Sequence, residues 1–246
     1  MDTEVPNFPA LRHKSVLPRG LAGGQAGIYI HLPFCRAKCN YCAFVSGPPA
    51  SDAEMDRYLD ALLIHLRQGA EGAGDRTFST LFLGGGTPSL LGPIRLTRLF
   101  AAVFEHYAFA PGAEITLEAN PESPTRELFE TLRPMGLNRV SLGAQSFDAG
   151  ELARIGRVHS VDQIHRAVDN ARAAGLGNLS LDLIFALPGQ TDEVTPIALQ
   201  GFIALFRIVG SDPLPSAYPS QCPQNTIPGN SVRSQQLAQV VFPFGH

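Results

Sequence analysis

The chain has 246 residues, of which 44% are hydrophobic and 17% charged, enough apolar material for one large α/β domain or two modest ones. Its formal net charge of −3 gives no global field that would gather nucleic acid or an acidic membrane, so we expect no nucleic-acid partner. No stretch approaches the roughly 20 apolar residues of a membrane-spanning helix, and residues 1–26 lack an apolar core of signal-peptide length, which predicts a cytoplasmic protein that does not span a membrane.

The first segment, residues 1–27, is rich in proline and glycine and shows neither helical nor strand periodicity, so we expect a flexible leader. From residue 28 onward, short apolar runs alternate with amphipathic stretches, a pattern that predicts repeated βα units around a parallel sheet. We expect strands at residues 28–32, 80–83, 114–119, 139–143 and 179–185.

Two helices are expected to follow the first two strands. An apolar stripe from Met55 to Leu66 predicts an amphipathic helix, and Ser51 with Glu54 predicts a capping box at its start. The next helix is expected at residues 93–106, where four apolar side chains form the buried face, namely Leu96, Leu99, Phe100 and Val103.

Two further helices are predicted by their end signals. Ser123 is expected to cap the third helix, with Pro124 at its first position and Gly136 just past its end. The fourth is expected to begin at Ser160, in a capping box with Gln163, and to end before a glycine at position 175.

Five such units are expected to curl into an α/β fold of the partial (β/α) TIM-like barrel type. The unusual segments of the sequence follow the predicted strands, where the sites of barrel proteins lie. We therefore expect one core over residues 28–191 with a single shared site. Residues 192–246 contain only 5 charged residues and 7 prolines, without clean alternation, which predicts an atypical tail, truncated or frame-shifted.

Three cysteines within eight positions, Cys35, Cys39 and Cys42, are a poor disulfide framework and a good metal loop. Three thiolates on a cluster of four irons leave one iron with open positions, where a small molecule can chelate. A structural zinc site with His31 as fourth ligand is an alternative, although such sites more often take paired ligands from two loops. Reduced, buried thiols without a metal are the other alternative.

The cysteine loop and its neighbours resemble the radical S-adenosylmethionine (SAM) family that contains oxygen-independent coproporphyrinogen III dehydrogenase (HemN) and the haem chaperone HemW. The resemblance rests on an ordered series of motifs, YIHLPFC at residues 29–35, LGGGTPSL at 83–90, LGAQSF at 142–147 and LDLIFALPGQT at 181–191. It implies a radical SAM barrel, a 4Fe-4S cluster on the three cysteines and bound SAM.

The resemblance also implies roles for single positions. Aromatic contacts to SAM are implied for Tyr29 and Tyr41, and the glycine-rich run is implied to lie along its methionine end through Gly85, Gly86 and Thr87. A carboxylate for the ribose hydroxyls and further cofactor-side positions are implied at Glu118, Gln145, Arg157 and Asp182. Without the resemblance, each of these polar residues has a structural alternative as a strand-end or helix-end residue.

Phe44 decides between the two branches of the family. Dehydrogenases of this family carry a fourth cysteine at its position, so the resemblance favours a HemW-like haem chaperone. The alternatives are oxidative decarboxylation of coproporphyrinogen III, a zinc protein and an inactive fragment, since the chain lacks tryptophan and hence the tryptophan-containing motif of the HemW carboxy-terminal domain. The implied partners are haem or porphyrin, a haem-accepting protein and a flavodoxin-type electron donor.

Overall fold

The computed structural model describes residues 26–184, 187, 190 and 237–240. Most of the expected leader, nearly all of the expected tail and several residues of the 181–191 motif lie outside this part of the chain. The described strands form a single six-stranded sheet in the order β1-β2-β3-β4-β5-β6.

The first five strands are parallel, and each is joined to the next through helical structure. Their bounds are β1 Ala26–Leu32, β2 Thr77–Gly85, β3 Ala108–Ala119, β4 Arg139–Gln145 and β5 Asn178–Ile184. Each contains all or nearly all of its predicted range, and the predicted α/β class and partial barrel are confirmed. The sixth strand, β6 Leu237–Val240, pairs antiparallel with β5.

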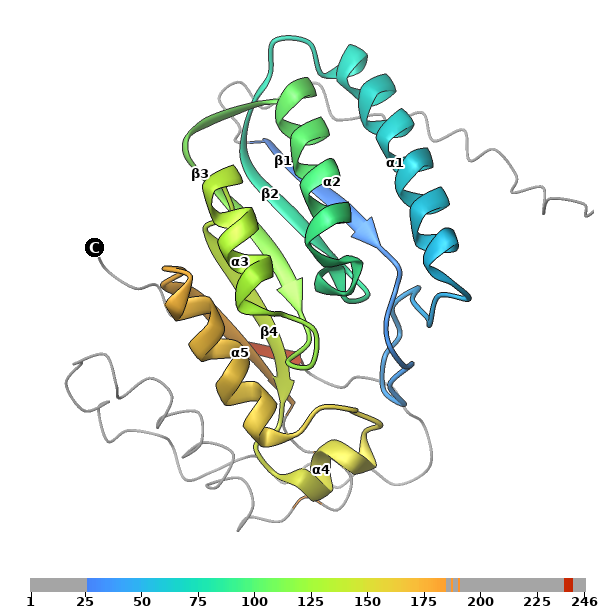
Figure 1. Cartoon of the computed structure of the whole chain (residues 1–246), viewed down its shortest axis with the longest axis vertical. Coiled ribbons are helices and arrows are strands. Elements are labelled where there is room, and N and C mark those ends of the chain that lie inside the picture. The colour runs from blue at the N-terminus through green and yellow to red at the C-terminus, as the bar shows by residue number, and fades with distance from the viewer. Residues whose placement is uncertain (1–25, 185–186, 188–189, 191–236, 241–246) are drawn as a thin grey trace, which may run out of the picture.

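The helices lie side by side on one face of the sheet, whereas α4 lies beyond the carboxyl ends of the strands (Figure 1). Their bounds are α1 Asp52–Ala73, α2 Gly92–His106, α3 Arg126–Leu132, α4 Ala149–Arg154 and α5 Val161–Ala173, with short 3₁₀ turns at Pro88–Leu91 and Arg133–Met135. Among the described residues, no helix is long and apolar enough to cross a membrane.

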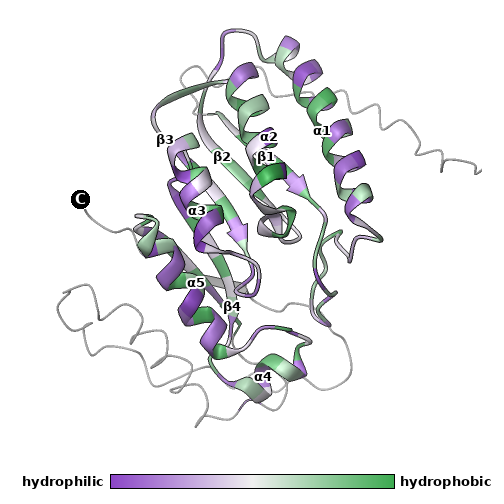
Figure 2. Ribbon diagram, viewed as in Figure 1, coloured by the Kyte–Doolittle hydropathy of each residue, from purple (hydrophilic) through white to green (hydrophobic). Residues whose placement is uncertain are grey.

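The two faces of the sheet differ because successive side chains of a strand point to opposite sides. On the face toward the helices, alternate residues are apolar and buried, as Leu117, Leu142 and Leu181 are. Hydrophilic and hydrophobic residues are interspersed along the covering helices, as amphipathic helices require (Figure 2). The opposite, inner face is polar toward the ends of β3, β4 and β5, so the core lies between the sheet and the helices and the site lies on the inner side.

Two predicted helix starts need correction. Ser51 caps α1, but the Glu54 carboxylate accepts a hydrogen bond from the backbone of Ala50, so the capping box is only half formed. Ser123 does not cap α3, because its hydroxyl donates to the Asn120 carbonyl and contacts Ser89. Thr125 takes the cap instead, two residues later.

The capping box at the start of α5 is confirmed. Ser160 Oγ accepts from the backbone N–H of Gln163 at 3.3 Å, and the Gln163 side chain accepts from the Ser160 N–H at 2.8 Å. We expect Ser160→Ala to lower the free energy of unfolding by about 1 kcal/mol, because the Gln163 N–H loses its side-chain acceptor. Urea denaturation checks this, with Ser160→Asp as the control that keeps an acceptor; an equal loss in both variants would contradict the prediction.

Candidate functional site

The cysteine loop follows β1 and is held against the glycine-rich segment after β2. Gly86 donates its N–H to the Leu32 carbonyl at 2.8 Å, and Thr87 donates to the Phe34 carbonyl at 2.7 Å. Within the loop, Phe34 forms a bridge to Gly47, so that the loop closes on itself. The thiols are therefore carried by a loop whose first residues are fixed by main-chain hydrogen bonds.

The other side of the loop rests on the connection between α4 and α5. Asn40 donates its backbone N–H to the Ile155 carbonyl at 3.3 Å and its side-chain amide to the Arg154 carbonyl at 3.4 Å. Tyr41 packs against a small apolar group of Ile155, Ile184 and Leu187. Segments that follow β1, β4 and β5 thus meet at the carboxyl ends of the strands, as predicted.

The three cysteines are free, with Cys35 buried and the other two partly exposed. Among the described residues, no three or more His, Cys, Asp or Glu side chains are grouped as metal ligands, so ligation stays a prediction. Two sulfurs nevertheless face hydrogen-bond donors, because Thr87 Oγ1 lies 3.5 Å from Cys35 Sγ and Arg157 Nη1 lies 3.5 Å from Cys39 Sγ. Donors directed at thiol sulfurs fit thiolates that bind a cluster.

Arg157 connects the thiols to the strand ends. Its Nη2 atom donates to Asn120 Oδ1 and to the Gly143 carbonyl, both at 2.6 Å. Burial alone lowers the pKa of this guanidinium, but the neighbouring Tyr41 and Cys39 outweigh that effect and raise its pKa. The side chain is therefore positively charged beside the sulfurs, and its Nε atom is buried without a hydrogen-bond partner among the residues that the structure describes.

The glycine-rich segment after β2 packs closely against β1 and β3. Gly85 has a φ of 109°, which glycine adopts without strain, and a Cβ atom there would lie 2.4 Å from the His31 ring. Its N–H donates to Glu118 Oε2 at 3.1 Å, which brings the β2 and β3 ends together. Thr87 is 2% exposed and faces the cysteine loop.

His31 does not offer a free nitrogen for zinc. Its Nε2 atom lies 2.9 Å from the Val45 carbonyl, which can only accept, so this nitrogen carries the proton. Its Nδ1 atom then accepts from the Tyr29 hydroxyl at 3.1 Å. Both ring nitrogens are engaged within the protein, which counts against the structural zinc alternative.

Three of the predicted side chains lie on the inner face of the sheet, namely Tyr29, Glu118 and Asp182. Tyr29 is largely exposed there, and burial followed by the charge of Glu118 raises its pKa. The Asp182 carboxylate accepts from Ser141 Oγ at 3.3 Å. The structure thus places these groups on one surface, formed by the middle of β1 and the carboxyl-terminal halves of β3 and β5.

Glu118 is the acidic centre of this surface. Burial raises its pKa, the Gly85 N–H opposes the shift, and the charge of Asp182 adds to it, while His31 and Arg139 oppose it more weakly. A carboxyl group with a raised folded-state pKa favours folding at low pH, and this contribution is lost as the pH rises through the folded pKa.

We therefore expect Glu118→Gln to stabilise the fold in a pH-dependent way. The amide mimics the protonated carboxyl and can still accept from Gly85, so the gain in unfolding free energy should be smallest near pH 4 and grow toward pH 7. Urea denaturation at several pH values measures it, with Glu71→Gln on the exposed side of α1 as the control. A gain that does not change with pH would contradict the raised pKa.

Gln145 has an unusual backbone at the end of β4. Its φ is 66°, the only positive value among the described non-glycine residues, and its side chain is buried with Oε1 unpartnered. A Cβ atom at Gly143 would lie 2.9 Å from Gln145 Nε2 and 3.0 Å from Asn120 Oδ1, so these amides converge beside Arg157. Strained residues of this kind concentrate at functional sites.

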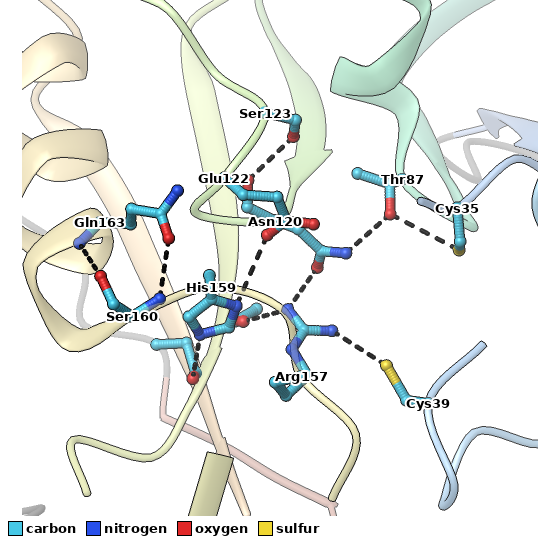
Figure 3. Close-up of polar contacts among 12 residues, drawn as sticks. Cys35, Cys39, Thr87, Asn120, Glu122, Ser123, Arg157, His159, Ser160 and Gln163 are labelled. Carbon is cyan, nitrogen blue, oxygen red and sulfur yellow. Dashed lines mark hydrogen bonds and ion pairs between the residues drawn. The ribbon is translucent and has the colours of Figure 1, made fainter. Parts of the chain in front are cut away.

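Sequence reasoning gave no role to three residues of this site. Asn120 links Thr87 to Arg157, and buried Glu122 places its Oε2 atom 3.5 Å from Nδ1 of buried His159 (Figure 3). Burial raises the pKa of Glu122, but His159 and Arg157 outweigh it, so the pKa lies below its ordinary value. Asn120 directly follows a predicted strand, so its position in the site could have been predicted from the sequence. The contact between Glu122 and His159 could not, because these residues are far apart in the sequence.

The amino-acid sequence is similar to a known protein family and to several characterised proteins. Residues 29–198 match the model of the radical SAM superfamily. The heme chaperone HemW of Mycobacterium tuberculosis is 43% identical over 175 residues, covering 70% of this chain and 45% of that protein. The heme chaperone HemW of Escherichia coli is 39% identical over 166 residues, with 68% and 44% covered.

A solved structure agrees with these matches. Coproporphyrinogen III oxidase (HemN) from Escherichia coli, described as a radical SAM enzyme, aligns with a TM-score of 0.69 and 31% identity. The alignment covers 74% of this chain and 42% of that one. The chain thus spans less than half the length of the relatives that it matches.

Proposed function

The chain belongs to the radical SAM superfamily, and from this premise we propose that it is the cluster- and SAM-binding core of a HemW-like haem chaperone. Cys35, Cys39 and Cys42 would hold a 4Fe-4S cluster. The observation that carries the proposal is the cysteine loop at the carboxyl ends of the strands, where donors from two other elements face two of its sulfurs. When bound and reduced, such a cluster supplies one electron to a chelated sulfonium compound.

The remaining site residues are proposed to hold SAM. Main chain near Gly85 and Gly86 can approach the methionine end closely, because no side chain intervenes. The Glu118 carboxylate is proposed to accept from ribose hydroxyls, and Tyr29 and Tyr41 to contact the cofactor. Thr87, Gln145, Arg157 and Asp182 complete the proposed cofactor side of the site. Burial, ahead of other effects, raises the pKa of Tyr41, so its hydroxyl stays protonated.

The chaperone role is favoured over porphyrinogen oxidation by one position in the cysteine loop. Phe44 stands where the oxidase branch has a fourth cysteine, and its side chain is 60% exposed beside the loop. The identities of 43% and 39% to proteins named heme chaperone support the same choice. Haem or porphyrin, a haem-accepting protein and a flavodoxin-type electron donor are the proposed partners, in the reducing cytoplasm where free thiols persist.

Anaerobic reconstitution with iron and sulfide tests the cofactor part. We expect a brown protein with about four irons per chain, which retains radiolabelled SAM on equilibrium dialysis. A colourless protein that takes up zinc but no sulfide would overturn the cluster proposal.

Turnover separates the two branches. The reconstituted chain is incubated with dithionite, SAM and coproporphyrinogen III, and separately titrated with haem. Haem binding without loss of porphyrinogen carboxyl groups supports the chaperone. Decarboxylation accompanied by 5′-deoxyadenosine would establish the oxidase instead.

A further inference from the structure

A continuous hydrogen-bonded chain joins two of the cysteine sulfurs through three side chains (Figure 3). It runs from Cys35 Sγ to Thr87 Oγ1 at 3.5 Å, then to Asn120 Nδ2 at 2.7 Å. From Asn120 Oδ1 it continues to Arg157 Nη2 at 2.6 Å, and Arg157 Nη1 reaches Cys39 Sγ at 3.5 Å. Three elements contribute, the turn after β2, the end of β3 and the connection between α4 and α5.

The donors and acceptors of the chain can be assigned without ambiguity. The Arg157 guanidinium only donates, so the Asn120 oxygen must face it and the Asn120 amide nitrogen must face Thr87. Because Thr87 Oγ1 accepts from that nitrogen, its own proton is available to Cys35. Every hydrogen bond therefore points away from Arg157, and both ends of the chain present a donor to a sulfur.

The arginine at the origin of the chain is held from several sides. Its Nη2 atom also donates to the Gly143 carbonyl at 2.6 Å, at the end of β4. Two residues later, buried His159 contacts Glu122 at 3.5 Å and the Ala144 carbonyl at 3.1 Å. These contacts fix the connection between α4 and α5 against the strand ends, so the guanidinium is positioned before any cofactor binds.

We propose that Thr87, Asn120 and Arg157 form a directional relay of hydrogen bonds that starts at the positively charged arginine. The relay directs a hydrogen-bond donor at each of two cluster thiolates and thereby raises the reduction potential of the cluster. This inference rests on the proposed function, since it needs the cluster on Cys35 and Cys39. The couple concerned is the addition of one electron, from an external reductant, to the oxidised cluster. Donors to the sulfurs stabilise the reduced form, which carries the additional negative charge. The three residues are positioning residues, because they act on the cluster through the thiolates.

The relay predicts different effects for two substitutions of similar shape. Thr87→Val removes the donor to Cys35 and the acceptor of Asn120 Nδ2, and it leaves the hydrogen bonds of Arg157 to Asn120 and Cys39 in place. Asn120→Asp replaces the amide by a carboxylate that can only accept, so Thr87 must turn its proton away from Cys35. Both variants should make the potential more negative, and Asn120→Asp should do so more strongly because it also adds a negative charge.

The experiment is an anaerobic redox titration of the reconstituted chain with dithionite, followed by electron paramagnetic resonance. For Asn120→Asp we expect about a tenfold loss in the equilibrium constant for reduction, about 59 mV for a one-electron couple. Thr87→Ser keeps the hydroxyl and should restore the potential. Arg154→Met is the matched control, because Arg154 is an exposed arginine of α4 that forms an ion pair with Glu151 at 3.9 Å.

The outcomes separate this inference from the proposed function. If the unsubstituted chain assembles about four irons and the potentials of Thr87→Val and Asn120→Asp equal its own, the relay is wrong while the cluster proposal stands. An equal shift in Arg154→Met would also overturn the relay, because net charge alone would explain it. If the unsubstituted chain assembles no cluster, both proposals fail. Circular dichroism and thermal unfolding confirm that each variant is folded.

Discussion

Replacement of Cys39 by alanine is expected to lower the iron content of the reconstituted chain from about four per chain to below about one. Two remaining thiolates on a partly exposed loop leave half of the irons without a protein ligand. The Cys39 sulfur also receives the hydrogen bond of Arg157, so its loss leaves that guanidinium facing an empty position. Iron and sulfide analysis and the visible absorption of the anaerobic protein measure the effect.

Cys222→Ala is the matched control for this prediction, because it removes the remaining cysteine of the sequence. It should leave the iron content unchanged. Retention of full iron and sulfide by Cys39→Ala, or a comparable loss in Cys222→Ala, would show that the three-cysteine loop is not the cluster site. Unfolding in urea of the metal-free proteins separates a ligation defect from a folding defect.

Substitution of Gly86 by alanine is expected to have the second large effect, on both stability and cluster binding. A Cβ atom there would lie 2.6 Å from the Phe34 carbonyl oxygen and 2.8 Å from the Leu32 carbonyl oxygen. These are main-chain atoms that cannot rotate away, so the two segments must separate. We expect a loss of about 1–3 kcal/mol in unfolding free energy.

The separation should also displace the cysteine loop, because Gly86 and Thr87 supply the hydrogen bonds that hold its first residues. Iron uptake of Gly86→Ala should therefore fall together with stability. Gly47→Ala is the control within the same loop, since a Cβ atom there meets nothing within 4 Å. Equal unfolding free energies and equal iron contents of the two variants would contradict the prediction.

The strands could be predicted from sequence because each is a short apolar run bounded by turn residues, and the parallel order follows from the intervening helices. The start of α3 could not be predicted, because Ser123 and Thr125, on either side of Pro124, are both possible N-caps. The choice depends on Ser89, which contacts the Ser123 hydroxyl from another element. Helix α4 has only six residues and therefore gives no periodic signal.

The candidate site also has a part that could be predicted from the sequence and a part that could not. The cysteine loop and Glu118 could be placed at strand ends from local patterns, whereas a role for Arg157 came only from the resemblance, and the structure brings Arg157 to Cys39. The link through Asn120 and the buried pair of Glu122 and His159 depend on distances between segments. No local pattern reports such distances, so these contacts required the fold.

The contacts of Asn40 with Arg154 and Ile155 have a consequence for biosynthesis. The partners Asn40 and Arg154 are 114 residues apart in the sequence. At about 5–20 residues per second, the ribosome adds the second partner roughly ten seconds after the first. The thiols therefore leave the ribosome before the residues of α4 that contact the loop have been synthesised, and we expect the loop to become fully ordered only after α4 has emerged.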